Sequence, residues 1–525
     1  MTILLSRFTR AIVLFFSFAV LIAPGSPAAE AETGWPVYSH DGQHTCIGSV
    51  PSFIPQMIRW STAVDLQPQY TGNDLFIHYG SPLITRRNTV ILPVKTGAED
   101  GFRVEAHRGS DGAVVWSLNT DFSLPPHQFA WVPICGVALI PGDHSVAIPG
   151  AGGTVILRNS PDSPCGEVKR LAFYGIENYK RDPAAFNASI QICTPISSDS
   201  HGNLYFGYVS TRSPLPGYPN GIPSGLARIS RGGGAIFASA AAISGHHFIE
   251  KVVYNCCPAF SHDGATLYVA VNHKPFGILG FFPPYLCALD SETLMRKASV
   301  PLVDPQSTPD NRLAANASDS GSASPTVGPD GDVYFGVLEA EFSSNHGRGW
   351  LLHFDEQLHR RKLASAFGWD DTASIVPADA VPSYHGPSAY LLLTKYNNYV
   401  QAGGNGRNFL AVVDPNVSMI DPVTGVSVMK TVLKVLGPTH DPELGGVREW
   451  CINSAAVDPI RHCAVVNSED GKVYRWNFDT NTLSAGLTLA PPTGEAYTPT
   501  LIGPDGAVYA INNARLFSCV AWDYR

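Results

Sequence analysis

The stretch "CCPAFSHDGATLYVAV" (256–271) contains two short apolar segments separated by a polar turn, "HDG" (262–264). Asp and Gly supply the backbone angles that a tight hairpin turn requires. After the turn, the side chains of "LYVAV" (267–271) alternate between two faces, and both faces are apolar. The stretch therefore predicts a β-hairpin that is covered on both sides.

The same pattern of a small residue, an apolar strand, a turn and a second strand recurs along the chain. It begins again at Gly80 ("GSPLITRRNTVILPV"), Cys193, Ala323 and Tyr497. Three weaker copies begin at Cys135, Ala380 and Asn453. The resulting eight units begin 44 to 73 residues apart, a period typical of propellers and repeat arrays.

Several units continue into a third strand and a further turn, as in "YLCALDSETLMRKASV" (285–300). Strand, turn, strand, turn and strand make one propeller blade, and packing blades around an axis buries both faces of each sheet. We therefore expect an all-β, eight-bladed propeller. Seven blades is the alternative, because the unit at Ala380 is weak. The segment "IRWSTAVD" (58–65) should join the last blade, so that N- and C-terminal strands share the closing sheet.

The first residues have the pattern of an export signal. Arg7 and Arg10 precede the apolar run 11–23, and small residues follow, with cleavage expected after Ala28 or Ala31. We expect residues 1–31 to be a signal peptide and residues 32–525 to be a single propeller domain. No other stretch is long and apolar enough to cross a membrane. The mature chain should thus be secreted or periplasmic.

The composition excludes some functions. A net charge of −9 disfavours a broad electrostatic hold on nucleic acid. The chain has no G-x-S-x-G, H-E-x-x-H, Walker loop or dinucleotide fingerprint. We expect a monomer with no metal and no fixed catalytic residues.

"GWPVYSHDGQHT" (34–45), "EAHRGSDGAVVW" (105–116) and "CALDSETLMRKA" (287–298) carry a family resemblance. They resemble the opening and the repeat of pyrroloquinoline-quinone (PQQ)-type propellers, in which a Trp docks one blade on the next. Only Trp116 stands at that docking position. The resemblance implies an eight-bladed quinoprotein-like propeller. That superfamily includes quinone-dependent dehydrogenases and non-catalytic members such as outer-membrane assembly factors.

Three functions follow as hypotheses. The first is a non-catalytic binding or scaffolding protein of the bacterial cell envelope, with a protein or glycan ligand and no cofactor. The second is a quinone- and calcium-dependent dehydrogenase of alcohols or sugars, because some such enzymes carry a vicinal disulfide like a bonded Cys256–Cys257. Glu449, Trp450, Asn453 and Asn255 are of the types that its ligands require. The third is a polysaccharide lyase or hydrolase that stacks sugars on aromatic rings, with Trp369, Trp450 and Tyr497 as candidates.

Residues just before each innermost strand should line one mouth of the central channel, where convergent polar and aromatic groups would form a pocket. The alternative is a water-filled rim of satisfied polar groups. The candidates are His246, His247, Tyr254, Asn255, Asp319, Arg448, Glu449, Trp450, Asn453, Glu495 and Tyr497.

Ten cysteines in an exported chain favour disulfides. Cys256 could bond to Cys257 or to Cys193. A bond between Cys46 and Cys519 would lock the ring closure, Cys135 and Cys165 bracket one unit, and Cys451 and Cys463 lie on consecutive strands. The two cysteines of the 256–257 pair could equally be buried thiols.

Overall fold

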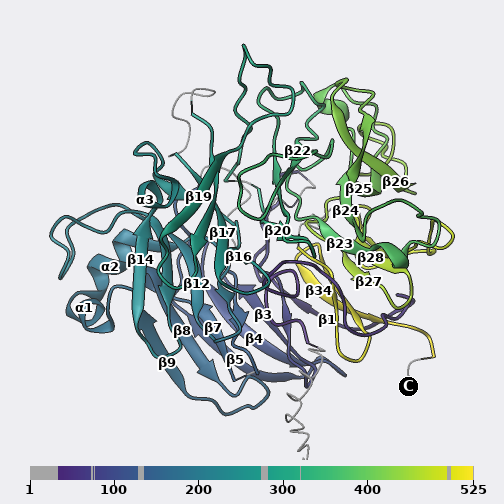
Figure 1. Ribbon diagram of the computed structural model, residues 1–525. Helices are drawn as coiled ribbons and strands as arrows, with labels where there is room; N and C mark the ends of the chain where they lie inside the picture. Colours follow the sequence, from purple (N-terminus) through teal and green to yellow (C-terminus); the bar gives the residue numbers. More distant parts are fainter. Residues whose placement is uncertain are drawn as a thin grey trace, which may run out of the picture. The chain divides into compact units, whose positions relative to one another are not determined.

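A computed structural model describes residues 34–523, except 73, 74, 76, 128–134, 143, 274–281, 320 and 493–497. The predicted signal peptide, 1–31, lies outside the described residues. The unit Thr33–Arg525 is an all-β, eight-bladed propeller (Figure 1), as the repeat predicts. No helix among the described residues has the length and apolarity that crossing a bilayer would take.

Each of the first four blades is an antiparallel sheet. Blade 1 contains β2 (Leu83–Ile84), β3 (Thr89–Lys95), β4 (Phe102–Arg108) and β5 (Val114–Thr120). Blade 2 contains β6 (Ala138–Leu139), β7 (Ser145–Pro149), β8 (Thr154–Asn159) and β9 (Val168–Ala172). Blade 3 contains β10 (Ile190–Ile192), β11 (Ser197–Ser198), β12 (Leu204–Ser210), β13 (Gly225–Ile229) and β14 (Ala235–Ser239). Blade 4 contains β15 (Lys251–Val252), β16 (Ala259–Phe260), β17 (Thr266–Asn272), β18 (Tyr285–Asp290) and β19 (Arg296–Pro301).

The other four blades complete the ring. Blade 5 contains β20 (Thr326–Val327), β21 (Val333–Val337) and β22 (Trp350–Phe354). Blade 6 contains β23 (Ser374–Pro377), β24 (Tyr390–Tyr396), β25 (Phe409–Ile420) and β26 (Ser427–Leu436). Blade 7 contains β27 (Ala456–Asp458), β28 (Cys463–Asn467), β29 (Lys472–Asn477), β30 (Thr482–Leu483) and β31 (Leu487–Thr488). Blade 8 contains β32 (Leu501–Ile502), β33 (Val508–Asn512), β34 (Arg515–Val520) and β1 (Met57–Ala63).

Short helices lie within blade 2, between blades 2 and 3, after blade 3 and within blade 6. They are η1 (Ala151–Gly153), α1 (Ile176–Arg181), α2 (Pro183–Ser189) and α3 (Ala240–Ser244), with η2 (Ala378–Ala380) and η3 (Val400–Ala402) in blade 6. Blade 6 corrects the sequence alignment, because its innermost strand is β23 and the motif therefore begins near Asp371, not at Ala380. The apolar segment at Ala380 lies between β23 and β24, and its likeness to the start of a unit caused the misalignment.

The two faces of each blade pack against different neighbours. In β17, Leu267, Val269 and Val271 join a core shared with blade 3, whereas Tyr268 and Ala270 join a core shared with blade 5. Eight such cores occur among the described residues, one between each pair of adjacent blades. Trp116 lies in the core between blades 1 and 2, where the resemblance places a docking Trp.

The ring closes as predicted, by pairing β1 with β34 in antiparallel register from Met57 opposite Val520 to Ala63 opposite Arg515. The purple and yellow strands in Figure 1 are this pair from the two ends of the chain. The Asp-Gly turns are hairpin turns, since Gly264 has φ 70° and the Asp263 carboxylate accepts from Ala265 N at 2.9 Å. The pairing of β1 with β34 removes the open sheet edge that a linear array of blades would leave.

The segment before β1 has a role that the sequence did not indicate. Carbonyls of residues 35–46 accept the backbone N–H of the second residue of six innermost strands in turn, at 2.7–3.0 Å. The donors, in the order of the ring, are Ile84, Leu139, Phe260, Val327, Ile375 and Val457. Innermost strands are sheet edges with unpaired N–H groups facing the axis. Residues 34–48, here called the axial segment, satisfy six of them.

Candidate functional site

The axial segment brings Tyr38 into a buried polar cluster on the propeller axis. Its hydroxyl lies 2.5 Å from Asn453 Oδ1, 3.0 Å from Thr372 Oγ1 and 3.3 Å from the Ser322 carbonyl. These partners precede the innermost strands of three different blades, 5, 6 and 7. Burial raises the pKa of Tyr38 well above its usual range, so the phenol stays protonated and can donate. Only Asn453 of this group was predicted from the sequence.

The cluster extends from Ser322 to a carboxylate and an imidazole. Asp370 Oδ1 accepts from Ser322 Oγ at 2.5 Å, and Asn453 Nδ2 donates to Ser322 Oγ at 2.8 Å. His78 Nε2 lies 3.9 Å from Asp370 Oδ2, and both side chains are almost completely buried. We call Tyr38, His78, Ser322, Asp370, Thr372 and Asn453 the axial cluster.

Two lysines, Lys251 and Lys395, have their ammonium groups bound by other residues of the chain. Lys251 pairs with Asp319 and lies 4.3 Å from the centre of the Tyr254 ring. Lys395 Nζ donates to the Asp370 carbonyl at 3.2 Å and attracts the carboxylate of Asp371. Buried charges persist in proteins when they are paired in this way. The pairs leave both ammonium groups engaged within the fold.

Asp371 is a buried carboxyl whose titration falls near neutral pH. Burial raises its pKa to about 7, although Lys395 and the Thr394 hydroxyl partly oppose the shift. An ordinary Asp in an unfolded chain titrates near pH 4. Between these values the folded state therefore binds more protons than the unfolded state, so stability falls as pH rises.

We expect this carboxyl to lower the free energy of unfolding by about 1.4 kcal/mol per pH unit between pH 4 and 7, on the order of 4 kcal/mol in all. The variant Asp371→Asn should lose that slope. Urea unfolding of both proteins from pH 4 to 8.5 measures it, with exposed Asp310→Asn as the control. Parallel pH profiles for wild type and Asp371→Asn would contradict the assignment.

A second group of polar residues lies on the blade 6–7 side. Oxygen atoms of Glu449 and Glu469 and the sulfur of Cys451 lie within 4.8 Å of one another. Burial, followed by repulsion from Glu469, raises the pKa of Glu449 well above its usual range and so favours its protonated form. Arg448 does not join this group, since its guanidinium faces Asp441 at 3.7 Å.

The remaining channel candidates are dispersed. His246 stacks on Tyr285 at 4.3 Å, so His246 and the exposed His247 lie by the third strand of blade 4 and not in the axial cluster. Trp450 is fully buried in the core between blades 6 and 7, edge-on to Tyr474. Tyr254 donates to the Pro126 carbonyl at 3.1 Å. Glu495 and Tyr497 lie outside the described residues.

The residues predicted for a quinone and calcium do not form one ligand set. Asn255 Nδ2 donates to the Gly321 carbonyl at 3.0 Å and Asn453 Nδ2 to Ser322, while Glu449 lies with Glu469. Trp450, buried between blades, offers no face for a ring to stack on. A quinone with several carboxylates also needs cations, and Lys251 and Lys395 are already engaged. The described residues therefore do not fit that cofactor, and the same burial of Trp450 removes it from a sugar-stacking platform.

The vicinal cysteines are buried thiols that face different interfaces. Cys256 packs in the core between blades 4 and 5, and Cys257 Sγ lies 3.1 Å from Ser197 Oγ of blade 3. Burial raises the pKa of both thiols, which makes them poor nucleophiles. Cys193, another buried thiol, contacts the same region through its carbonyl, which accepts from Asn255 N at 2.9 Å.

The other expected disulfides are likewise absent, for a geometric reason. Cys46 is a thiol at the axis, whereas Cys519 is a thiol on β34, two strands outward, or about 10 Å away. Cys135 precedes innermost strand β6, but Cys165 is exposed between β8 and β9. Cys463 begins β28 and Cys451 lies near Glu469 beyond its other end, further than a disulfide reaches.

The comparison with solved structures finds matches to this chain, whereas the two sequence comparisons find none. No family model and no curated protein sequence matches the chain. A europium-containing methanol dehydrogenase superposes with a TM-score of 0.51 and 9% identity, over 91% of this chain and 89% of that one. The quinohemoprotein alcohol dehydrogenase of Comamonas testosteroni gives 0.50 and 10%, over 93% and 80%. BamB from Moraxella catarrhalis gives 0.44 and 12%, over 89% and 98%.

At such identities the likeness concerns the fold. Eight antiparallel blades of three to five strands, a closing sheet shared by the two ends of the chain and a docking Trp between blades 1 and 2 are all present in this chain. The chain therefore has the PQQ-like, eight-bladed β-propeller fold.

Proposed function

We propose that the protein is a non-catalytic binding or scaffolding propeller of the bacterial cell envelope, exported by the signal at residues 1–31 and monomeric in its mature form. The observation that carries the proposal is the engagement of the axial polar groups with one another. Lys251 is bound to Asp319, Lys395 to the Asp370 carbonyl, and Tyr38 to Asn453. A catalytic pocket instead keeps convergent groups available to substrate.

The vicinal cysteines support the same proposal. The dehydrogenase hypothesis depends on a Cys256–Cys257 disulfide next to a quinone, and the two thiols face different blade interfaces instead. Two dehydrogenases share the fold, but fold alone does not transfer an activity. The binding function would then use the outer surfaces and loops of the propeller, where such folds commonly carry recognition.

A reconstitution experiment tests the proposal. The chain from Gly34 onward, purified from the periplasm, is incubated with PQQ and calcium, dialysed, and assayed for a retained chromophore and for dye reduction with alcohols and sugars. An apo-quinoprotein alcohol dehydrogenase treated identically is the positive control. We expect neither chromophore nor turnover from this protein. A retained quinone at one per chain with dye reduction would overturn the proposal.

A further inference from the structure

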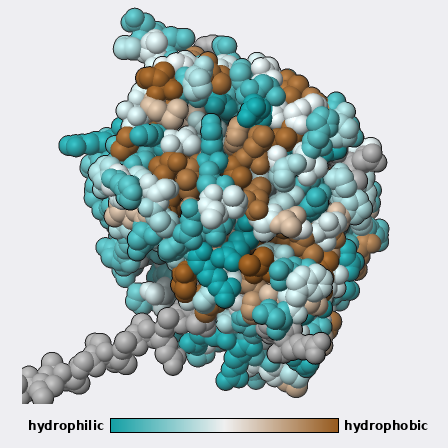
Figure 2. Space-filling model, turned by 90° about the vertical axis from the view of Figure 1, so that its right-hand side faces the viewer, coloured by the Kyte–Doolittle hydropathy of each residue, from teal (hydrophilic) through white to brown (hydrophobic). Residues whose placement is uncertain are grey.

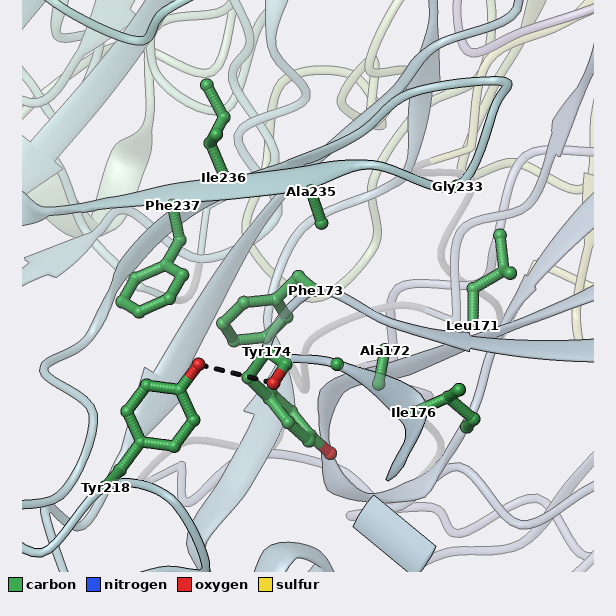
Figure 3. Close-up of a pocket in the computed structure, with 11 residues that line it drawn as sticks. Leu171, Ala172, Phe173, Tyr174, Ile176, Tyr218, Gly233, Ala235, Ile236 and Phe237 are labelled. Carbon is green, nitrogen blue, oxygen red and sulfur yellow. Dashed lines mark hydrogen bonds between the residues drawn. The ribbon is translucent and has the colours of Figure 1, made fainter. Parts of the chain in front are cut away.

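An aromatic hollow opens between blades 2 and 3, at their outer strands. It has a volume of about 510 Å³ and is lined by the end of β9, the start of α1 and strand β14. Figure 3 shows the rings of Phe173, Phe237 and Tyr218 around it, with Ala235 pointing inward and Ile236 pointing to the other side of β14. We call Phe173, Tyr174, Tyr218 and Phe237 the aromatic hollow.

The walls of the hollow are held in place by the fold itself. The Tyr218 hydroxyl donates to the Tyr174 carbonyl at 3.2 Å, and the Tyr174 hydroxyl donates to the Gly152 carbonyl at 2.6 Å. Phe173 packs on Tyr208 with ring centres 4.4 Å apart. A partner would therefore meet a preformed surface and would not lose binding energy by ordering it.

Strand β14 borders the hollow and offers an open sheet edge. In an antiparallel pair of strands, only every second residue of one strand forms backbone hydrogen bonds to the other. Ser230 N donates to the Gly234 carbonyl, and Ala240 N donates to the Ser224 carbonyl. The pairs 230–234 and 224–240 are thus hydrogen-bonded. Because Ala235 lies opposite Ile229, the residues of β14 between these pairs that bond to β13 are Ile236 and Ala238. The backbone groups of Ala235, Phe237 and Ser239 consequently face away from β13, and β13 is the only strand paired with β14 among the described residues.

The edge lacks the usual protection against pairing. Outer strands are commonly blunted by Lys, Arg or Pro. The outer strands β9, β19, β26 and β1 all contain Lys or Arg. Strand β14 reads "AIFAS" and contains neither Lys, Arg nor Pro, as is also true of β5, β22 and the two-residue strands β30 and β31. The face in Figure 2, on the side of the molecule away from β14, carries several groups of apolar side chains among polar ones.

The stretch of sequence that contains the hollow has an excess of basic residues, whereas the whole chain has an excess of acidic ones. Residues 166–240 contain seven Lys or Arg and four Asp or Glu, although the chain carries a net charge of −9. Lys169, two residues before Leu171 on β9, and Arg231, two residues before Gly233, are both exposed. Leu171 and Gly233 lie on the same side of the hollow in Figure 3, so both cations are expected near the end of the bound strand that lies beside the start of β14.

We propose that β14 binds an extended acidic segment of a partner protein by strand addition, with one aromatic side chain of that segment in the aromatic hollow. This proposal rests on the proposed binding function and names its site. Backbone bonds to Ala235, Phe237 and the N–H of Ser239 supply affinity, while the hollow and the two cations supply selectivity.

The probe is a fluorescein-labelled peptide, EDTVFVTDE, titrated with the chain from Gly34 onward and followed by anisotropy. We expect saturable binding that weakens at least about tenfold in the peptide EDTVAVTDE, because an aromatic anchor dominates such contacts. The basic peptide KKTVFVTKK should bind more weakly at low salt, and the difference should shrink as salt screens the charges.

Variants of the protein separate strand addition from loose adhesion. Ala235→Pro removes an outward N–H without breaking a bond to β13, and we expect about tenfold weaker binding. Lys169→Glu and Arg231→Glu should each weaken binding several-fold, whereas Lys430→Glu, at an exposed lysine on the outer strand of blade 6, should not. Unchanged melting of each variant shows that it folds.

Hydrogen exchange of the wild-type protein gives a test that needs no variant. Amides of Ala235, Phe237 and Ser239 should exchange faster than those of Ile236 and Ala238, and the peptide should slow the first set. Absence of peptide binding, or binding that Ala235→Pro leaves intact, overturns the proposal without touching the cofactor result. A dimer that Ala235→Pro dissolves would make a second copy the occupant and would also overturn it.

Discussion

A chain that begins at Met57 should lose more than about 5 kcal/mol of folding free energy relative to one that begins at Gly34. The shorter chain retains β1 and hence the closing sheet, but it lacks the axial segment. Six backbone N–H groups at the axis then lose their acceptors, and each unsatisfied buried group costs about 1–3 kcal/mol. Fully buried Trp35 and Cys46 also leave the core between blades 8 and 1. Such a loss approaches the whole net stability of an ordinary domain.

Urea unfolding of the two chains measures this difference. Because the shorter chain could simply fail to fold, a synthetic peptide of residues 34–56 is added back in trans. We expect the peptide to restore a cooperative transition in a concentration-dependent way, since it binds only the folded state. A scrambled peptide serves as the control. Midpoints that coincide for the two chains would contradict the role given to the axial segment.

The second large effect concerns the buried pair Lys95 and Asp65, which fastens the closing sheet to blade 1. Lys95 Nζ lies 3.0 Å from both carboxylate oxygens, and the two side chains are at most 2% exposed. Asp65 follows β1, while Lys95 ends β3. The variant Lys95→Met leaves the buried Asp65 carboxylate with the Tyr79 hydroxyl and the backbone N–H of Gln67 as its remaining donors. We expect a loss of about 3–5 kcal/mol.

The matched variants make this result specific. The double variant Lys95→Met with Asp65→Asn removes both charges and should recover most of the loss, because a neutral pair avoids the uncompensated charge. Lys430→Met, at an exposed lysine, should stay within about 0.5 kcal/mol of wild type. Urea midpoints provide all three values. Equal stability of the single and double variants would show that the pair is not what couples these strands.

The blades could be predicted from the sequence because their signals are local. An alternating strand such as β17 and a turn such as Asp263-Gly264 are encoded within a few residues, and the structure confirms both. The sixth blade was misplaced because an insertion put an apolar segment at Ala380 in competition with β23. Because this unit was placed too far along the chain, Asp370 and Asp371 were not chosen as channel candidates. They lie just before innermost strand β23, the position from which the candidates in other units were taken.

The axial cluster could be predicted only in part. Asn453 was found by its offset from an innermost strand, but Tyr38 precedes no such strand and meets Asn453 across 415 residues of sequence. The disulfide hypotheses failed for the same reason. An even number of cysteines and an exported chain favour disulfides, but a bond forms only where two thiols are close. Cys46 lies in the axial segment, whereas Cys519 lies on β34, the third strand of blade 8 counted from the axis.

Hydrogen exchange resolved by residue tests most directly whether the axial segment closes the propeller axis with its own backbone. The four amides of Phe260, Val327, Ile375 and Val457 each donate to a carbonyl of residues 42–46. We predict that all four exchange as slowly as the amide of Tyr268, which lies within the central strand β17. Fast exchange at these four amides, with Tyr268 still protected, would show that the segment leaves the axis and would contradict the account.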